Sequence, residues 1–316
     1  NRVEYFISFY DYYQPESYIP QKDLYIEKDS QINPLIERMR LSATASLLTR
    51  KDTIVVASVS CIYGIGNPKN YQGMGLDITK KTKQKRTDLI GSLLNMQYER
   101  NDMELLTGRF RVKGDTIDII PGNEKDILRV ELFGNEIEKI TFIDRNTGEP
   151  IQSFDHYFLF PARHFVTPQN EMERALRAIE KELHQRLPHL EMIESHRLKQ
   201  RTLYDLEMIK TIGFCKGIEN YSRHFEERKE GEKPFCLLDY FGDDFLFVID
   251  ESHQTIPQLH GMYNGDRQRK QTLVDYGFRL PSALDNRPLK FEETEKYMQK
   301  QQVIFVSATP SKYCDK

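Results

Sequence analysis

Cysteine is scarce in this 316-residue sequence, and no two cysteines lie close together. There are four of them, with no C-x-x-C pair: Cys61, Cys215, Cys236 and Cys314. This spacing argues against a zinc site and against a disulfide framework. It fits a reducing compartment, so we expect a cytoplasmic protein.

Long apolar runs are lacking as well. The longest, residues 53–59 and 245–249, fall far short of the roughly 20 residues that a membrane helix needs, and no signal peptide opens the sequence. We therefore expect no membrane contact. Because the sequence lacks an initiator methionine and starts within a strand-like run, residues 3–7, we interpret it as a fragment.

A positive net charge and a phosphate-binding loop are also missing. The formal net charge is −3, so a nucleic-acid site would have to be local. The pattern G-x-x-x-x-G-K-[ST] does not occur, and Gly-Lys is found nowhere. A nucleotide phosphate needs the backbone amides and the lysine of that loop. We therefore expect that this sequence alone does not bind ATP in the usual manner, and that the loop lies upstream of Asn1.

What is present begins with short, nearly continuous apolar runs rich in β-branched residues. Three of them are residues 54–57, 245–249 and 303–306. Such runs predict parallel strands that are buried on both faces. Asn33 as an N-cap and Pro34 at the first helical position predict a helix that ends near Arg50. Together these patterns indicate an α/β domain.

Between residues 67 and 162 charged and apolar residues alternate instead. The charged positions in two such runs are Arg109, Arg111 and Lys113, and then Arg129 and Glu131. A period of two predicts half-buried antiparallel strands with one charged face, in a β-rich module inserted into the α/β domain. The lysine-rich residues 80–86 favour a solvated loop over a phosphate contact.

A helical region follows. Thr167 and Pro168 are typical of an N-cap and a first helical position. Apolar residues then recur every three or four positions, at Met172, Leu176, Ile179, Leu183 and Leu187. Pro188 interrupts the pattern, and a second helix continues through residues 206–209. The apolar stripe predicts packing against a core rather than a cofactor site.

An Asp-Glu pair directly follows the apolar run at residues 245–249. A strand that ends in Asp250 and Glu251 is typical of a Walker B site, in which the aspartate holds Mg²⁺ and the glutamate polarises the attacking water. Alone, the pair also suits any exposed strand end. The run at 303–306 ends in Ser307, Ala308 and Thr309, however, and Asp-Glu-x-His with His253 followed by Ser-Ala-Thr indicates a helicase-like motor.

Aromatic residues crowd near the start of the chain. Six occur in 17 positions from Phe9 to Tyr25, the others being Tyr10, Tyr12, Tyr13 and Tyr18. On an extended hairpin such rings can stack on unpaired bases, or wedge between base steps. The alternative is a small aromatic core or a protein interface. Beside a motor core, the DNA interpretation is favoured.

With these motifs the sequence resembles the UvrB family of bacterial nucleotide excision repair along essentially its whole length. The resemblance rests on YYQPE (12–16), ASVSCIYG (57–64), GIENYSR (217–223), DESH (250–253), MYNGDR (262–267) and LPSALDNR (280–287). It implies an ATP- and Mg²⁺-dependent ATPase that receives damaged double-stranded DNA from UvrA, verifies the lesion with a β-hairpin, and recruits UvrC for incision.

The resemblance also implies roles for residues of the hairpin, which would span residues 9–31. Tyr12 and Tyr13 at its base would contact nucleotides, and the residues that assist strand separation would be Tyr10, Tyr18 and Tyr25. Glu16 and Arg40 match positions that the family uses to handle DNA. Phe9 stands where the family often has tyrosine, which keeps the ring and loses the hydroxyl.

The inserted module corresponds to the family's UvrA-binding domain. Its contact residues would be Arg100, Arg111, Lys113, Arg129 and Glu131. Lys113 replaces an arginine of some relatives and so loses bidentate geometry. Residues 70–86 depart from the family pattern, and we assign them no role.

The implied architecture is a partial RecA-like helicase motor domain of the P-loop NTPase type. It would comprise residues 1–8, 34–66 and 226–316, with the hairpin at 9–31, the UvrA-interaction domain at 67–162 and a helical DNA-clamp domain at 163–225. Two alternatives stay open. One is a non-catalytic UvrA-binding adaptor, like the UvrB-like module of the transcription-repair coupling factor, and the other is a general translocase.

Overall fold

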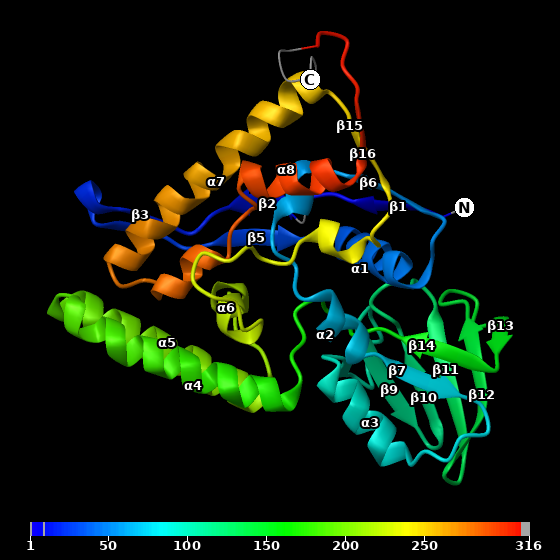
Figure 1. Ribbon diagram of the computed structural model, residues 1–316. Helices are drawn as coiled ribbons and strands as arrows, with labels where there is room; N and C mark the ends of the chain where they lie inside the picture. The colour runs from blue at the N-terminus through cyan, green and yellow to red at the C-terminus, as the bar shows by residue number, and fades with distance from the viewer. Residues whose placement is uncertain (1, 9, 311–316) are drawn as a thin grey trace. The chain divides into compact units, whose positions relative to one another are not determined.

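A computed structural model describes residues 2–8 and 10–310, with residues 10–12 and 30–32 described by their backbone only. The fold is mixed α/β, and it divides into two compact units (Figure 1). The first unit comprises residues 1–9, 33–56 and 67–166, and the second comprises residues 10–32, 57–66 and 167–316. Among the described residues, no helix has both the length and the apolar character required to span a bilayer.

The first unit contains most of the strands. Its helices are α1 (Pro34–Thr49), α2 (Pro68–Gly73) and α3 (Arg86–Asn95). Its strands are β1 (Arg2–Phe6), β6 (Thr53–Ala57), β7 (Leu76–Thr79), β8 (Glu99–Arg100), β9 (Arg109–Lys113), β10 (Thr116–Ile119), β11 (Ile127–Phe133), β12 (Glu136–Ile143), β13 (Pro150–Phe154) and β14 (His156–Leu159).

Helix α1 begins where the sequence predicts. Asn33 is extended, and its side chain accepts a hydrogen bond from the Leu35 N–H, while Pro34 occupies the first turn. Both features satisfy or avoid a backbone donor that the first turn leaves without a helical partner. The helix ends at Thr49 because Arg50 is extended, which confirms the predicted boundary.

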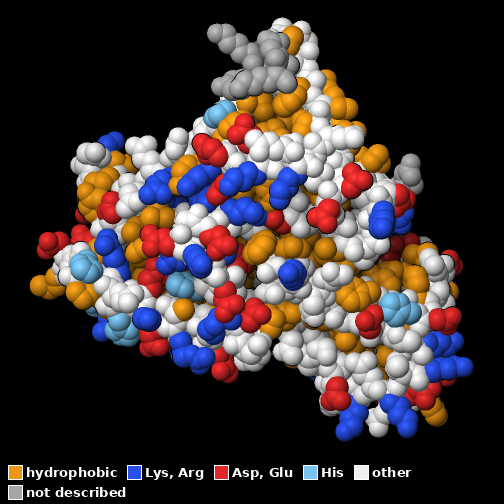
Figure 2. All heavy atoms as spheres, viewed as in Figure 1, with side chains coloured by type: hydrophobic (Ala, Val, Ile, Leu, Met, Phe, Trp, Pro, Cys, Tyr) orange, Lys and Arg blue, Asp and Glu red, His pale blue; other side chains and the backbone are white. Residues whose placement is uncertain are grey.

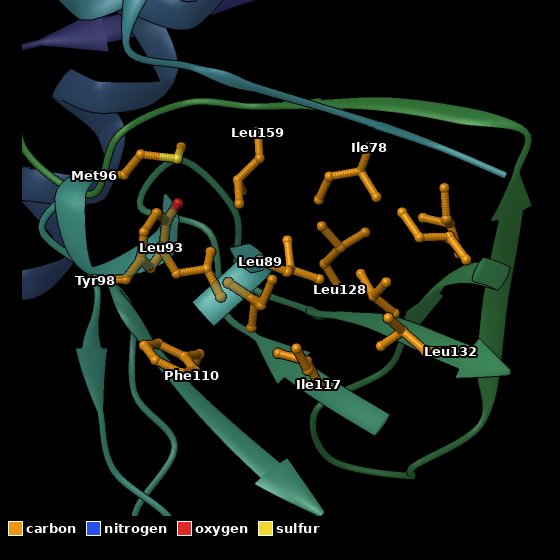
Figure 3. Close-up of a cluster of buried hydrophobic side chains, with 14 of the residues drawn as sticks. Ile78, Leu89, Leu93, Met96, Tyr98, Phe110, Ile117, Leu128, Leu132 and Leu159 are labelled. Atoms are coloured by element: carbon orange, nitrogen blue, oxygen red, sulfur yellow. The ribbon is translucent and has the colours of Figure 1, made fainter. Parts of the chain in front are cut away.

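A six-stranded sheet dominates the first unit, in the order β13-β12-β11-β10-β9-β8. All neighbours are antiparallel except β8 and β9. Its apolar face packs with Leu89 and Leu93 of α3 into one buried core that includes Phe110, Ile117 and Leu128 (Figure 3). The predicted alternation of a buried and a charged face is therefore confirmed. The predicted solvated loop at residues 80–86 is mostly exposed.

The first unit contains a buried histidine, His164. His164 is 9% exposed, lies 2.9 Å from Thr44 Oγ1 through Nε2, and packs beside the Tyr71 ring. Burial, with a smaller contribution from the Arg40 charge, lowers the pKa of His164 to about 3. The folded state therefore keeps the imidazole neutral at a pH where the unfolded chain protonates it.

Acidification is expected to destabilise this unit. Below the unfolded pKa of about 6.5 the unfolded chain binds one more proton, so stability should fall by about 1.4 kcal/mol per pH unit between about 6.5 and the folded pKa. Urea unfolding from pH 7 to 4.5 would measure this. His164→Gln should flatten the slope, and the exposed His196→Gln should leave it unchanged. Equal slopes in wild type and His164→Gln would contradict the assignment.

The second unit contains most of the helices. They are α4 (Gln169–Arg186), α5 (Met192–Ile212), α6 (Ser222–Phe225), α7 (Ser252–Asp275) and α8 (Phe291–Lys300). Its strands are β2 (Tyr10–Gln14), β3 (Ser17–Ile19), β4 (Leu24–Ile26), β5 (Asp29–Ile32), β15 (Leu246–Ile249) and β16 (Gln302–Phe305). Its short 3-10 turns are η1 (Pro20–Lys22), η2 (Val59–Ile62), η3 (Leu187–His189), η4 (Ile218–Tyr221), η5 (Leu237–Tyr240) and η6 (Pro281–Asp285).

The predicted helical pair is present, with one correction. Helix α4 starts at Gln169 with Pro168 as its N-cap, not at Pro168 with Thr167 as cap. The reason is that Pro168 is extended (ψ 148°), so its carbonyl accepts the first helical hydrogen bonds instead of lying inside the helix. The predicted apolar stripe packs into the core of the helical region, and Pro188 lies in the turn between α4 and α5.

Strands β15 and β16 pair in parallel, as their apolar sequences predict. The prediction that such strands are buried on both faces is wrong, because Leu246, Val248 and Ile304 are each about half exposed. The same holds for Ile54 and Val56 of β6. In the described part of the chain, β15 and β16 form a sheet of two strands that packs by one face only, and hydrophobic side chains appear along it in Figure 2.

The aromatic segment forms two antiparallel ladders. β2 pairs with β5, and β3 pairs with β4 further along the hairpin. Tyr12 lies opposite Gln31 and Tyr13 opposite Ser30, whereas Tyr18 lies opposite Tyr25. Backbone pairing therefore divides the tyrosines between the base of the hairpin and its outer part.

Candidate functional site

The ends of β15 and β16 bring together the two motifs that the sequence singled out. The Ser252 N–H donates to the Val306 carbonyl, and the Val306 N–H donates to the Ile249 carbonyl. Parallel pairing thus places the residues after β15 beside those after β16. His253 Nδ1 lies 2.8 Å from Ser307 Oγ, in a hydrogen bond whose donor depends on the histidine tautomer.

Two carboxylates lie at the same strand end. Glu251 adopts a left-handed conformation (φ 45°) as the chain turns from β15 into α7, and its N–H donates to Asp250 Oδ1. A non-glycine residue in this region is strained, and such strain concentrates at functional sites. Glu251 Oε2 lies 3.4 Å from His253 Nδ1, and its side chain is 63% exposed. The carboxylates remain accessible to solvent.

The other two residues of the second motif are less engaged. The Thr309 N–H donates to Ser307 Oγ, so Ser307 bonds both to its own segment and to His253. Ala308 and Thr309 are both exposed, whereas Ser307 is partly buried. Ser307 is therefore the residue that links the two strand ends.

These residues fit a magnesium ion that is held mainly by its substrate. Among the described residues, no group of three or more histidine, cysteine or carboxylate side chains could enclose a metal ion. Mg²⁺ in nucleotide sites keeps several waters and takes one or two protein carboxylates besides phosphate oxygens. An exposed Asp250 at a strand end meets that requirement.

The hairpin tyrosines differ in their surroundings. The side chains of Tyr10 and Tyr12 lie outside the described residues, as does Phe9 altogether. The Tyr13 side chain is 49% exposed. Tyr18 and Tyr25, by contrast, pack against Phe278, which Tyr25 stacks on with ring centroids 4.5 Å apart.

Hydrogen bonds hold the outer part of the hairpin. The Tyr18 hydroxyl donates to Asp23, and the Tyr25 hydroxyl donates to Glu16 Oε1. Burial and the hydrogen bond to Glu16 raise the pKa of Tyr25. These contacts are those of the aromatic core that the sequence left open as an alternative; what the rings do on DNA stays a prediction.

Glu16 is a buried acid with a buried partner. Its two oxygens accept from Arg279 Nε at 2.8 Å and Nη2 at 3.0 Å, and both side chains are less than a tenth exposed. Arg269 Nη1 also donates to the Glu16 carbonyl. Sequence reasoning missed Arg279, because a single arginine between apolar neighbours carries no periodic signal.

Two further ion pairs join the hairpin to the helical region of the same unit. Lys28 Nζ lies 3.0 Å from Glu219, and Lys216 Nζ lies 2.7 Å from Glu27. The first is partly buried and the second exposed, so the second contributes little. Arg40 belongs to the first unit, where its Nη1 donates to the Ile7 carbonyl and its guanidinium lies 3.7 Å from the centre of the Phe6 ring.

The polar face of the six-stranded sheet carries the predicted UvrA contacts. Arg111 and Arg129 both bind Asp118, and Glu131 lies 4.0 Å from Lys139. Lys113 is exposed in the same strand as Arg111. Arg100 lies at the sheet edge and pairs with Asp102.

Asp118 was not predicted, although a signal existed. It alternates with Ile117 and Ile119 in β10, and the cross-strand register sets it opposite Arg111 on one side and Arg129 on the other. Burial favours its protonated form, but hydrogen bonds from Arg129 and Arg111 outweigh that effect and hold the pKa of Asp118 below its usual value.

Comparison with known proteins assigns both the region with the six-stranded sheet and the helical region to UvrB domains. Residues 76–165 match the UvrB interaction domain, and residues 170–227 match the UvrB third helical domain. The chain is 67% identical over 313 residues to UvrABC system protein B of Methanosarcina acetivorans, covering 99% of this chain and 46% of that protein. The corresponding protein of Methanococcus maripaludis is 65% identical, with 99% and 48% covered.

A bacterial relative is somewhat less similar. The UvrABC system protein B of Carboxydothermus hydrogenoformans is 54% identical over 318 residues, with 99% of this chain and 48% of that protein covered. The chain thus spans about half the length of the curated relatives it matches. With two UvrB domains and these identities along nearly all of its residues, the chain belongs to the UvrB family.

Proposed function

We propose that the whole protein acts in nucleotide excision repair as an ATP-driven verifier of DNA damage. The names of its relatives place them in the UvrABC system. In this proposal the protein works in the cytoplasm, receives damaged duplex DNA from UvrA, probes it with the hairpin and recruits UvrC. The strands β15 and β16 belong to a RecA-like motor domain.

The observation that carries the proposal is the hydrogen bond between His253 and Ser307. It connects the segment with the candidate Mg²⁺ and water residues, Asp250 and Glu251, to the segment that follows β16. In a motor, nucleotide state has to reach the DNA-binding elements through contacts that exist in two arrangements. The contact between His253 and Ser307 lies outside the regular hydrogen bonding of the sheet, and in this proposal it changes with the nucleotide state.

Bound ATP and Mg²⁺ supply the leaving group and the positive charge that stabilises the transferring phosphoryl group. Asp250 would orient Mg²⁺ from the end of β15. Glu251 would accept a hydrogen bond from the attacking water and hold it in line. His253 lies 3.4 Å from the Glu251 carboxylate and is hydrogen-bonded to Ser307, so it would transmit a change at the carboxylate to Ser307.

The base of the hairpin is expected to control DNA binding. Replacing Tyr12 and Tyr13 by alanine removes two rings, each worth about 1–3 kcal/mol if it stacks on a base, so damaged-DNA complexes should weaken by about tenfold or more. Gel-shift titration of full-length protein loaded by UvrA onto a lesion-bearing duplex measures this. Tyr5→Ala, which removes an exposed ring on β1 outside the hairpin and the helical region, should leave loading unchanged. If the Tyr12 and Tyr13 variant were loaded as well as the wild type, the hairpin base would not be a DNA contact.

The charged sheet face is expected to bind UvrA. Arg111→Glu reverses a charge at its centre and should weaken UvrA binding by about a hundredfold, because like-charge contacts cost several kcal/mol. Pull-down and titration with purified UvrA give the readout, with thermal melting to verify folding. The matched charge reversal Arg177→Glu, exposed on α4, should bind normally. Equal retention of both variants would remove the assignment of this face.

A non-catalytic UvrA-binding adaptor would keep the sheet face and need neither carboxylate. The two functions therefore differ in one measurement, which is ATP turnover by the full-length protein. Loss of turnover on changing Glu251 supports the motor, and absence of any turnover in the wild type supports the adaptor.

A further inference from the structure

Asp118 lies between two arginines on the polar face of the six-stranded sheet. Arg129 donates from Nε to Asp118 Oδ1 at 2.7 Å and from Nη2 to Oδ2 at 3.0 Å. Arg111 donates from Nε and Nη2 to the same Oδ2, at 3.0 and 2.9 Å. One carboxylate therefore binds two guanidinium groups from the neighbouring strands β9 and β11.

Asp118 is much more buried than the two arginines that bind it. The Asp118 side chain is 4% exposed, whereas those of Arg111 and Arg129 are 25% and 33% exposed. Each guanidinium uses its Nε and one Nη2 hydrogen on Asp118, and the Nη1 group of each has no hydrogen-bond partner within the described residues. The arginines thus cover the acid while remaining partly exposed themselves, and each keeps a donor group that Asp118 does not use.

The charges of this cluster do not cancel. Two guanidinium groups and one carboxylate leave a net positive charge, and Lys113 lies exposed two residues further along β9. A guanidinium whose geometry is already fixed loses little rotamer entropy when it binds a planar anion. Such a pair matches carboxylates on a protein surface, since a carboxylate accepts two parallel N–H groups.

We propose that Asp118 is a positioning residue of this interface, holding Arg111 and Arg129 in the geometry that binds carboxylate side chains of UvrA. The inference rests on the proposed function, in which this face binds UvrA. Asp118 itself does not touch the partner. Its carboxylate fixes the direction of two groups that do, so its effect on affinity is exerted entirely through them.

The test replaces Asp118 by asparagine, which has the same shape and lacks the charge. In the full chain, titration with purified UvrA should give binding about tenfold to a hundredfold weaker, because charge-assisted hydrogen bonds that orient both arginines are lost. The Nε–H resonances of Arg111 and Arg129, followed after selective labelling, should shift and broaden. Asp115→Asn, an exposed acid in the same module, is the matched control and should bind like wild type.

Asp118→Glu covers the case in which the asparagine variant does not fold. It keeps the buried negative charge and moves it by one methylene, so the fold should persist while UvrA binding falls several-fold. The proposal is overturned if a folded Asp118→Asn, or failing that Asp118→Glu, binds UvrA with wild-type affinity. If instead Arg111→Glu has no effect on UvrA binding, the interface itself is misassigned and the positioning role falls with it.

Discussion

Replacing Glu251 by glutamine in the full-length protein is expected to lower ATP turnover by about a hundredfold to ten-thousandfold, the usual contribution of a positioned acid–base group. Glutamine keeps the shape of the side chain and loses the charge that orients the attacking water. The exposed carboxylate belongs to Glu251, the left-handed residue that follows β15, so the backbone conformation sets the direction in which the side chain leaves the chain. A coupled assay of phosphate release gives the rate.

The control for this change is another exposed glutamate of the same unit. Glu295→Gln on α8 should leave turnover unchanged, and both variants should retain UvrA binding, because the sheet face belongs to the other unit. If Glu251→Gln hydrolyses ATP at the wild-type rate, the strand-end carboxylates are not the hydrolytic residues. A wild-type protein with no turnover would favour the adaptor.

Local patterns predict much of the secondary structure of this chain. Asn33 and Pro34 start α1 as expected, since a cap and a fixed proline φ act within a few residues. The alternation around Arg111 and Arg129 predicts the polar sheet face for the same reason, because side chains in a strand point to opposite faces. Interactions between residues that are close in sequence therefore determine these features.

Helix α7 escaped prediction because its sequence opposes helix formation locally. It contains Pro257 as well as Gly261 and Gly265, residues that disfavour helix interiors. Packing overrides propensity here, since Ile256 and Leu259 are buried with Ile249 of β15 in one cluster. For β15 and β16 the prediction of burial on both faces was wrong, because an apolar sequence does not show whether a second layer of structure covers the strands.

The candidate site divides in the same way. Asp250, Glu251, His253 and Ser307 could be found because two motifs end two apolar strands. Their contact could not, since it depends on parallel pairing of segments more than fifty residues apart. Partners that come from a distant segment, such as Arg279 for Glu16, leave no mark in the local pattern.

Replacing Arg279 by methionine is expected to destabilise the second unit by about 3–5 kcal/mol. The Glu16 carboxylate would remain buried with no cation beside it, and an uncompensated buried charge costs far more than the pair contributes. Urea denaturation measures the loss, and limited proteolysis should show faster cleavage of residues 15–28, because the pair holds the hairpin against the helical region of the unit. A hairpin released in this way would no longer be preorganised for DNA.

Two comparisons make the Arg279 experiment decisive. Arg267→Met removes an exposed arginine of α7 that bonds only within its own helix among the described contacts, and it should cost no more than about 0.5 kcal/mol. The double variant Glu16→Gln with Arg279→Met removes both charges and should recover most of the stability, since well-packed neutral groups often replace a buried ion pair without loss. If Arg279→Met costs as little as Arg267→Met, the hairpin is held instead by the stacking of Tyr25 on Phe278, and Phe278→Ala should then release it.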